Sequence, residues 1–186
     1  MPKIVDHNLY RQELLSKCFD LFASKGYGSV TMREIAQGIG VSTGTLYHYF
    51  SGKEAIFLQL VEEQTKQDIS NFLATADRNQ PLSGRIETLF NFIAKNEDYF
   101  QQQILIWVDF CRHQDNQEVL NNEKLKQADE EIRQVLTDYL QVDELIIELI
   151  FSLIYGILMA RLFEGKTISY TNQGNLLAKM LTVYLQ

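Results

Sequence analysis

Apolar residues recur along most of the chain at intervals of three and four, the spacing that places side chains on one face of an α-helix. The first such run extends from Leu15 to Phe22 and is closed by Gly26. Later runs predict helices over about 52 to the high seventies, 82–95, 97–114, 117–140, 143–164 and 172–185. Segment 166–171 looks extended and is expected to be a loop. The pattern therefore predicts an all-α protein.

Two shorter helices are predicted between the first run and the helix that starts near residue 52, because their ends are marked. The capping-box pattern, a Ser or Thr followed three residues later by Glu, occurs at Thr31–Glu34 and again at Ser51–Glu54. Gly38 and Gly40 stand where the first short helix must stop. Ser42 is placed to cap the second one. These signals predict a helix-turn-helix motif over about residues 31–50.

The second short helix is expected to present its outer face rather than to be stable alone. Leu46 and Phe50 are four residues apart and share one side, so we expect them to face inward. Thr43, Tyr47 and His48 are then left outside. A helix this short is marginal without packing. Its exposed hydroxyl and aromatic side chains are of the kind that reach into the major groove of DNA.

Four stretches of this region resemble the TetR family of transcriptional regulators. They are Phe22–Gly28, Thr31-Met-Arg-Glu-Ile-Ala, Gly40-Val-Ser-Thr-Gly-Thr-Leu-Tyr-His-Tyr-Phe and Lys53-Glu-Ala-Ile-Phe-Leu. The resemblance covers roughly residues 8–60, and the extension Leu-Tyr-x-Tyr-Phe-x-x-Lys makes it specific. It implies a three-helix helix-turn-helix DNA-binding head followed by a larger helical-bundle regulatory and dimerisation domain.

The resemblance implies DNA contacts at both ends of the motif. Residues matching Thr31 and Arg33 open the positioning helix and touch a phosphate or a base. A salt bridge with a nearby carboxylate is an equally good interpretation of Arg33. The lysine matching Lys53 grips a phosphate, and its place in the first turn of a helix favours an anion there. A solvated surface lysine is the alternative.

The recognition helix carries the other implied DNA contacts: Ser42, Thr43, Thr45, Tyr47, His48 and Tyr49. The three hydroxyl residues lie at its amino end. The two tyrosines contact the DNA backbone, and Tyr47 or His48 reaches a base edge. An ordinary exposed tyrosine is the alternative interpretation of Tyr47.

The net charge of −7 opposes DNA binding, because neutralisation of phosphates dominates affinity for DNA. Residues 1–55, however, carry six Lys or Arg and five Asp or Glu, a net charge of +1, and the acidity belongs to the remainder. The head is therefore only weakly basic. We infer that useful affinity needs two heads on one duplex.

Composition is that of a globular protein, with 46% apolar and 22% charged residues. We predict two domains, a DNA-binding domain over 1–55 and a ligand-sensing and dimerisation domain over 56–186.

Cys18 and Cys111 have no pairing or metal-binding spacing, and no apolar signal-peptide core is visible, so a cytoplasmic location is expected.

The segment from Leu145 to Phe163 contains 15 apolar residues and could be mistaken for a membrane span. Glu148 and Arg161 would each cost about 2.5–3.5 kcal/mol at a bilayer centre. We therefore expect a buried helix and no membrane partner.

Two apolar stripes near the carboxyl end predict a homodimer interface. In the TetR family the last two helices pair with their copies in a second subunit, and packing within one chain is the alternative. The stripes are Leu149, Leu153, Gly156 and Ala160, then Leu177, Met180, Leu181 and Tyr184.

Aromatic residues are plentiful between the motif and the last helix, and they could line a pocket for a small apolar or amphipathic effector. For any single one of them a core position is the better interpretation. The candidates are Phe72, Phe90, Tyr99, Trp107, Phe110, Tyr139, Phe151 and Tyr155.

Asp109 and His113 lie one helical turn apart but lack a third ligand with suitable spacing, so no metal site is expected. No nucleophile elbow, phosphate loop or paired-carboxylate site is recognisable, and we expect neither a cofactor nor an enzyme.

Together these features predict a ligand-responsive repressor that acts as a homodimer on a near-palindromic operator in double-stranded DNA. A small molecule would act by shifting the helix that starts near Gly52. The alternatives are a helix-turn-helix module that binds another protein, and a small-molecule-binding helical protein or enzyme that does not bind DNA.

Overall fold

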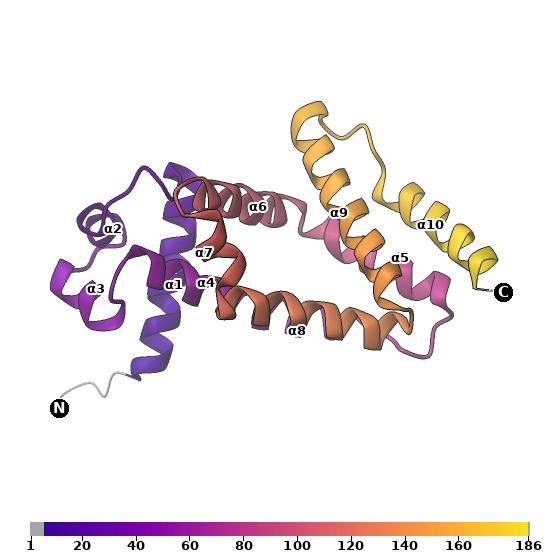
Figure 1. Cartoon of the computed structure of the whole chain (residues 1–186), viewed down its shortest axis with the longest axis horizontal. Coiled ribbons are helices and arrows are strands. Elements are labelled where there is room, and N and C mark those ends of the chain that lie inside the picture. Colours follow the sequence, from indigo (N-terminus) through magenta and orange to yellow (C-terminus); the bar gives the residue numbers. More distant parts are fainter. Residues whose placement is uncertain (1–5, 186) are drawn as a thin grey trace. The chain divides into compact units, whose positions relative to one another are not determined.

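The computed structural model describes residues 6–185, and over these residues the chain forms ten α-helices and no strand (Figure 1). The all-α prediction is confirmed. In chain order the helices are α1 His7–Lys25, α2 Met32–Gly38, α3 Thr43–Tyr49, α4 Lys53–Leu73, α5 Leu82–Lys95, α6 Glu97–Arg112, α7 Asn116–Asn121, α8 Glu123–Leu140, α9 Glu144–Glu164 and α10 Tyr170–Tyr184.

The helices form two compact units. Among the described residues, unit 1 comprises 6–66 and Gln103–Ala128, and unit 2 comprises Gln67–Gln102 and 129–185. This division differs from the boundary predicted after residue 55. The reason is that α4, α6 and α8 each contribute residues to both units, and the carboxyl end of α6 packs on the amino-terminal helices. The rings of Phe57 and Phe110 are stacked there, with their centroids 3.7 Å apart.

Two helix boundaries depart from the sequence pattern. α4 ends at Leu73 rather than in the high seventies. The helix predicted over 117–140 is divided into α7 and α8 at Asn122, whose backbone is extended (ψ 114°). The Asn122 side chain accepts hydrogen bonds from the amides of Lys124 (3.1 Å) and Leu125 (3.3 Å). An asparagine that ends one helix therefore also caps the next.

Buried apolar side chains of unit 1 support the helix-turn-helix motif. Leu46 and Phe50 are 0% and 1% exposed, as their spacing predicted, and Ile35 of α2 is equally buried. Gly40 adopts φ +75°, which is strained for any residue with a side chain, so the turn between α2 and α3 requires glycine. Gly52, not Ser51, precedes α4: its carbonyl accepts from the amide of Ile56 at 3.1 Å. The second predicted capping box is therefore wrong.

In unit 2, α5 packs on α10 so closely that a Cβ added to Gly174 would lie 3.0 Å from the ring of Phe90. α9 contributes a buried face that includes Ile147 and Ile150, both 0% exposed. The guanidinium of Arg161 on α9 holds the carboxylate of Glu97, with Nη2 donating to Oε2 at 2.9 Å. This contact explains why a charged residue sits in so apolar a helix.

By length and composition α9 could cross a membrane, since it contains a window of mean hydropathy 2.1. That is weak evidence, because a core helix of a soluble protein has the same length and composition.

Candidate nucleic-acid interface

The first turn of α2 is fixed by the capping box that the sequence predicted. The Thr31 hydroxyl accepts from the amide of Glu34 at 3.3 Å, and the Glu34 carboxylate accepts from the amide of Thr31 at 2.8 Å. Thr31 also donates its hydroxyl proton to Glu34 at 2.7 Å. These hydrogen bonds hold the pKa of Glu34 below its usual value. Thr31 therefore has a role in the helix start that does not depend on DNA.

Arg33 lies on the exposed side of α2. Among the residues that the structure describes, no carboxylate forms an ion pair with it, so the salt-bridge interpretation has no support. Its guanidinium is available to a partner.

The amino end of α3 is held by its own hydroxyls. Ser42 accepts from the amide of Thr45 at 2.9 Å, and the two side-chain hydroxyls lie 2.8 Å apart. Ser42 is exposed, whereas Thr43 and Thr45 are half-buried. Of the outer residues, Tyr47 is 53% exposed and His48 is exposed as well. The outward positions of Tyr47 and His48 are confirmed.

Tyr49 is tied back to the start of α1. Its hydroxyl lies 2.8 Å from Nδ1 of His7, and its ring meets the edge of Tyr10 with the centroids 5.5 Å apart. The ring of His48 lies 5.0 Å from that of Tyr49 and 6.3 Å from that of His7. The place of His7 beside the motif could not be predicted from sequence, because His7 lies 42 residues away from Tyr49 and outside the motif.

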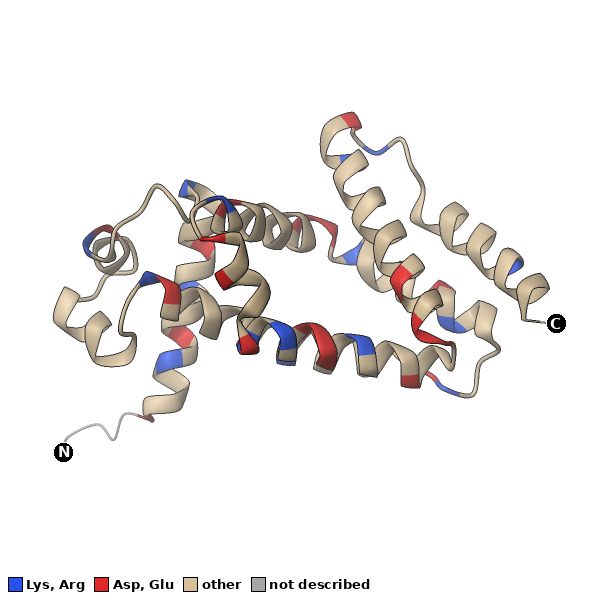
Figure 2. Cartoon of the chain, in the orientation of Figure 1, with Lys and Arg blue, Asp and Glu red and all other residues tan. Residues whose placement is uncertain are grey.

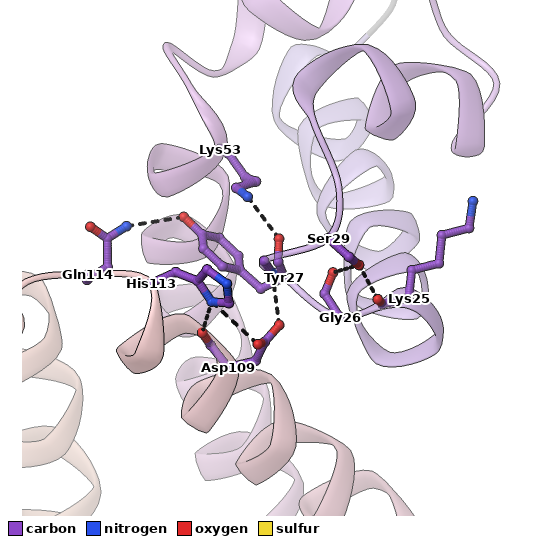
Figure 3. A network of polar contacts seen from close by, with 9 residues as sticks. Lys25, Gly26, Tyr27, Ser29, Lys53, Asp109, His113 and Gln114 are labelled. Carbon is purple, nitrogen blue, oxygen red and sulfur yellow. Dashed lines mark hydrogen bonds and ion pairs between the residues drawn. The ribbon is translucent and has the colours of Figure 1, made fainter.

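Lys53 is directed into unit 1 (Figure 3). Its ammonium donates to the carbonyl of Tyr27 at 2.9 Å and lies 4.3 Å from the centroid of the Tyr27 ring. Burial lowers the pKa of Lys53, against an opposing effect of the Asp109 carboxylate. The ammonium keeps further donors for a phosphate, but it is not a solvated surface lysine.

A polar junction fastens the carboxyl end of α6 to the loop after α1 (Figure 3). The Asp109 carboxylate accepts from the amide of Gly28 at 2.8 Å. His113 lies 2.7 Å from the carbonyl of Asp109, and Gln114 donates to the hydroxyl of Tyr27 at 3.4 Å. A Cβ on Gly28 would lie 2.1 Å from the His113 ring, so a side chain at position 28 would displace that ring. The Asp109–His113 pair thus belongs to this junction.

Permanent charge is sparse on the motif, and α3 carries no Lys, Arg, Asp or Glu (Figure 2). The neutral face matches the weakly basic head that the sequence predicted. Any added cation near α3 should therefore have a large relative effect on binding to a polyanion.

The eight predicted effector-pocket residues are divided between the two compact units. Trp107 and Phe110 belong to unit 1, whereas the other six belong to unit 2. Four of the eight are core residues at most 4% exposed, namely Phe72, Phe90, Phe110 and Tyr139. Tyr99 and Phe151 are half-buried, and Tyr155 is 52% exposed. The rings of Phe72 and Tyr139 pack against each other within unit 2, with their centroids 5.0 Å apart. A single aromatic pocket formed by the eight residues stays a prediction.

A cavity of about 410 Å³ in unit 2 is lined by none of these eight residues. Its lining comes from α5 and α10: Ser83, Asn175, Ala178, Lys179, Thr182 and Val183.

The predicted dimer residues divide between surface and core. On α9, Leu149 is 49% exposed, and a Cβ on Gly156 would meet nothing within 4 Å. Leu153 and Ala160 of the same stripe are half-buried. The face also carries Leu145 and Phe163, which are 67% and 76% exposed.

On α10, Met180 and Tyr184 are 57% and 67% exposed, as an interface requires. Leu177 and Leu181 are corrected: they are 3% and 4% exposed and belong to the core of unit 2. Their neighbours Leu176 and Val183 are the ones that stand out, at 53% and 76%.

The chain is similar to known bacterial regulatory proteins. The model of the family described as bacterial regulatory proteins, tetR family, matches residues 14–60. The HTH-type transcriptional repressor Rv1474c of Mycobacterium tuberculosis is 36% identical over 69 residues, which are 36% of this chain and 37% of that protein.

Two solved structures share the fold. A tetR-family transcriptional regulator from Streptomyces coelicolor superposes with a TM-score of 0.70 at 20% identity, covering 96% of this chain and 81% of the other. The transcriptional regulator FadR from Bacillus subtilis, in complex with stearoyl-CoA, gives a TM-score of 0.68 at 20% identity over 91% and 96% of the two chains.

The chain spans between 37% and 66% of the lengths of the first curated relatives that it matches. The residues that the family model matches include α2 and α3. The amino-terminal helix-turn-helix domain of this chain therefore belongs to the TetR family of bacterial regulatory proteins.

Proposed function

We propose that this protein is a sequence-specific DNA-binding transcriptional repressor that acts as a homodimer and responds to a small molecule. The observation that carries the proposal is the outer face of α3. Leu46 and Phe50 are buried beneath it, while Tyr47 and His48 stand exposed above. A short helix braced in this way enters the major groove in helix-turn-helix proteins.

We assign the recognition of base edges to exposed side chains that form no capping hydrogen bond within the motif. Arg33 and Tyr47 are the first candidates, because both are exposed and an arginine can donate two hydrogen bonds to guanine. Thr31, Ser42 and Thr45 are already engaged in helix capping and side-chain hydrogen bonds. They are better placed to orient the two helices and offer amides to phosphate.

Support for a homodimer comes from unit 2. Phe163 and Val183 are each 76% exposed, and Leu145 and Tyr184 each 67%. Side chains this apolar on two helices form patches of the kind that mark protein interfaces. A second copy would bury them and would supply the second head that a weakly basic first head needs.

Responsiveness to a ligand is supported by a structural neighbour, FadR from Bacillus subtilis, which was solved with stearoyl-CoA. In this chain α4 contributes residues to both units, so a molecule bound in unit 2 could act through it. The ligand must bind the form that does not fit DNA more tightly than the form that does.

Selection of bound sequences from a random duplex pool tests the DNA-binding proposal. The purified chain should enrich a near-palindrome with half-sites about one helical turn apart, roughly 34–36 Å. Enrichment of a single half-site would contradict the dimer but keep DNA recognition. No enrichment, together with no retention of duplex at low salt, would reject DNA binding and favour a protein-binding module.

A further inference from the structure

His7 and His48 converge on Tyr49 at the exposed carboxyl end of the recognition helix. His7 is the first residue of α1, and its Nδ1 lies 2.8 Å from the hydroxyl of Tyr49. The two imidazole rings are 6.3 Å apart, and each packs against the Tyr49 ring. Both histidines are exposed. Two of the three histidines of the chain are therefore gathered at one point of the predicted DNA-binding surface.

We propose that His7 and His48, joined through Tyr49, form a phosphate-binding site whose grip on DNA requires protonation of the imidazoles. The inference rests on the proposed DNA-binding function and extends it to pH-dependent affinity. Histidine is the side chain whose charge ordinarily changes between pH 5 and 8. Because α3 has no permanent charge, a protonated His48 would be the one cation that α3 itself carries.

The hydrogen bond between His7 and Tyr49 links protonation to phosphate binding. A neutral His7 can accept a hydrogen bond at Nδ1 from the Tyr49 hydroxyl. A protonated imidazole has a proton on both nitrogens, so Nδ1 must donate to the Tyr49 oxygen. The tyrosine hydroxyl proton is then free to turn outward. Protonation of His7 thus creates an imidazolium and also frees the Tyr49 hydroxyl to donate. Both groups can donate a hydrogen bond to a phosphate oxygen.

Other charged groups near this cluster are already engaged. On α1, the Asp6 carboxylate accepts from the amides of Asn8 (2.9 Å) and Leu9 (3.3 Å). Arg11 is turned toward α4, where its Nε donates to Gln59 at 2.7 Å. Tyr10 meets the cluster through its ring edge against Tyr49.

The test is DNA affinity of the full chain at pH 6.0 and 8.0, with a fluorescent random-sequence 30-base-pair duplex at matched ionic strength. Phosphodiester charge is constant over this range, so any change comes from the protein. We expect tighter binding at pH 6.0. The slope of log K against log salt should steepen by about one for each imidazolium that contacts a phosphate.

The double variant His7→Gln/His48→Gln should bring the ratio of affinities at the two pH values close to one. Tyr49→Phe keeps the ring but removes the hydroxyl, and should reduce the ratio in part. His113→Gln is the matched control, because His113 lies in the Asp109 junction and should leave the ratio as in wild type. Circular dichroism at both pH values confirms that each variant is folded.

Three outcomes would overturn the proposal: equal wild-type affinity at both pH values, an unchanged ratio in the double variant, or loss of the ratio in His113→Gln. Each of them leaves DNA binding itself intact. Failure to bind the duplex at either pH would instead reject the proposed function.

Discussion

The ammonium of Lys53 contacts other residues of unit 1, in addition to the DNA phosphate that it is proposed to bind. It donates to the Tyr27 carbonyl and lies over the Tyr27 ring. The family resemblance implied only a phosphate contact, because a contact between residues 26 positions apart leaves no trace in the local pattern. A substitution here should therefore change both folding and binding.

Replacing Lys53 with Met keeps the apolar stem and removes the charge. We expect the free energy of unfolding to fall by about 1 kcal/mol, since a hydrogen bond and a cation–π contact are lost. Binding to all duplexes should weaken alike, with the salt slope lower by about one. Urea denaturation and salt titrations measure the two effects. Lys17→Met, at an exposed lysine paired with Glu13, is the control, and an unchanged slope in Lys53→Met would disprove the phosphate contact.

Tyr139 is fully buried, yet its hydroxyl has no hydrogen-bond partner among the residues that the structure describes. A buried polar group without a partner costs about 1–3 kcal/mol. Tyr139→Phe should therefore leave the free energy of unfolding unchanged or raise it by about 1 kcal/mol. Tyr27→Phe is the matched control: it loses the bond from Gln114 and should be slightly destabilised. A clear loss of stability in Tyr139→Phe would mean that the hydroxyl has a partner.

Among the elements, those whose ends are set by local chemistry could be predicted from sequence. Thr31, Glu34, Ser42 and Gly40 act on residues within one turn, and the structure confirms each of them. The break at Asn122 could not be predicted in this way, because asparagine is tolerated inside a helix as well as at its ends.

The faces of α9 and α10 were harder to assign, since both helices are apolar on more than one side. Periodicity groups Leu177 with Met180 and Leu181, but it does not show which of these side chains another helix of the same chain will bury. Packing of α10 against α5 buries the two leucines and leaves Met180 outside. The aromatic pocket stays a prediction for the same reason, because composition cannot tell a ring that lines a cavity from one that fills the core.

The pair of Glu97 and Arg161 joins α6 to α9 within unit 2, and both side chains are about nine-tenths buried. The guanidinium lowers the pKa of Glu97. A lowered carboxyl pKa contributes stability that is present above the unfolded value near 4.5 and is lost as pH falls through the folded value.

Glu97→Gln should lower the free energy of unfolding by about 3 kcal/mol at pH 7, because it leaves a buried guanidinium without its counter-ion. The difference from wild type should shrink as the pH falls from 4.5 through the lowered folded pKa of Glu97, below which the wild-type carboxyl group is also protonated. Urea unfolding at several pH values measures it. Glu87→Gln, at an exposed position on α5, is the control. A difference that does not depend on pH would exclude the ion pair as its source.

At the scale of the whole molecule, the exposed apolar faces are the feature that a single chain leaves unexplained. Gly156 lies on the exposed side of α9 with open space around it. A charged side chain there fits the folded chain without a clash, so its effect should be confined to association.

We expect Gly156→Glu to convert the proposed homodimer to a monomer, because two copies of the carboxylate would be buried close to each other. Sedimentation equilibrium measures the mass, and urea unfolding shows whether the chain remains folded. Asn91→Glu adds the same charge at an exposed position on α5 and should leave the mass unchanged. A dimer of undiminished stability in Gly156→Glu would place the interface elsewhere.

The bond from the Gly28 amide to Asp109, and the His113 ring against Gly28, bear on how this protein can be recombined with others. A chimera cut after the motif would discard residues 103–128, which belong to the same compact unit. The transplanted head would lose the rings and the carboxylate on which its first loop rests. Exchange of heads between relatives should therefore succeed only when the amino-terminal segment and residues 103–128 are transferred together. The alternative is a recipient that has an acidic and an aromatic residue at the positions of Asp109 and His113.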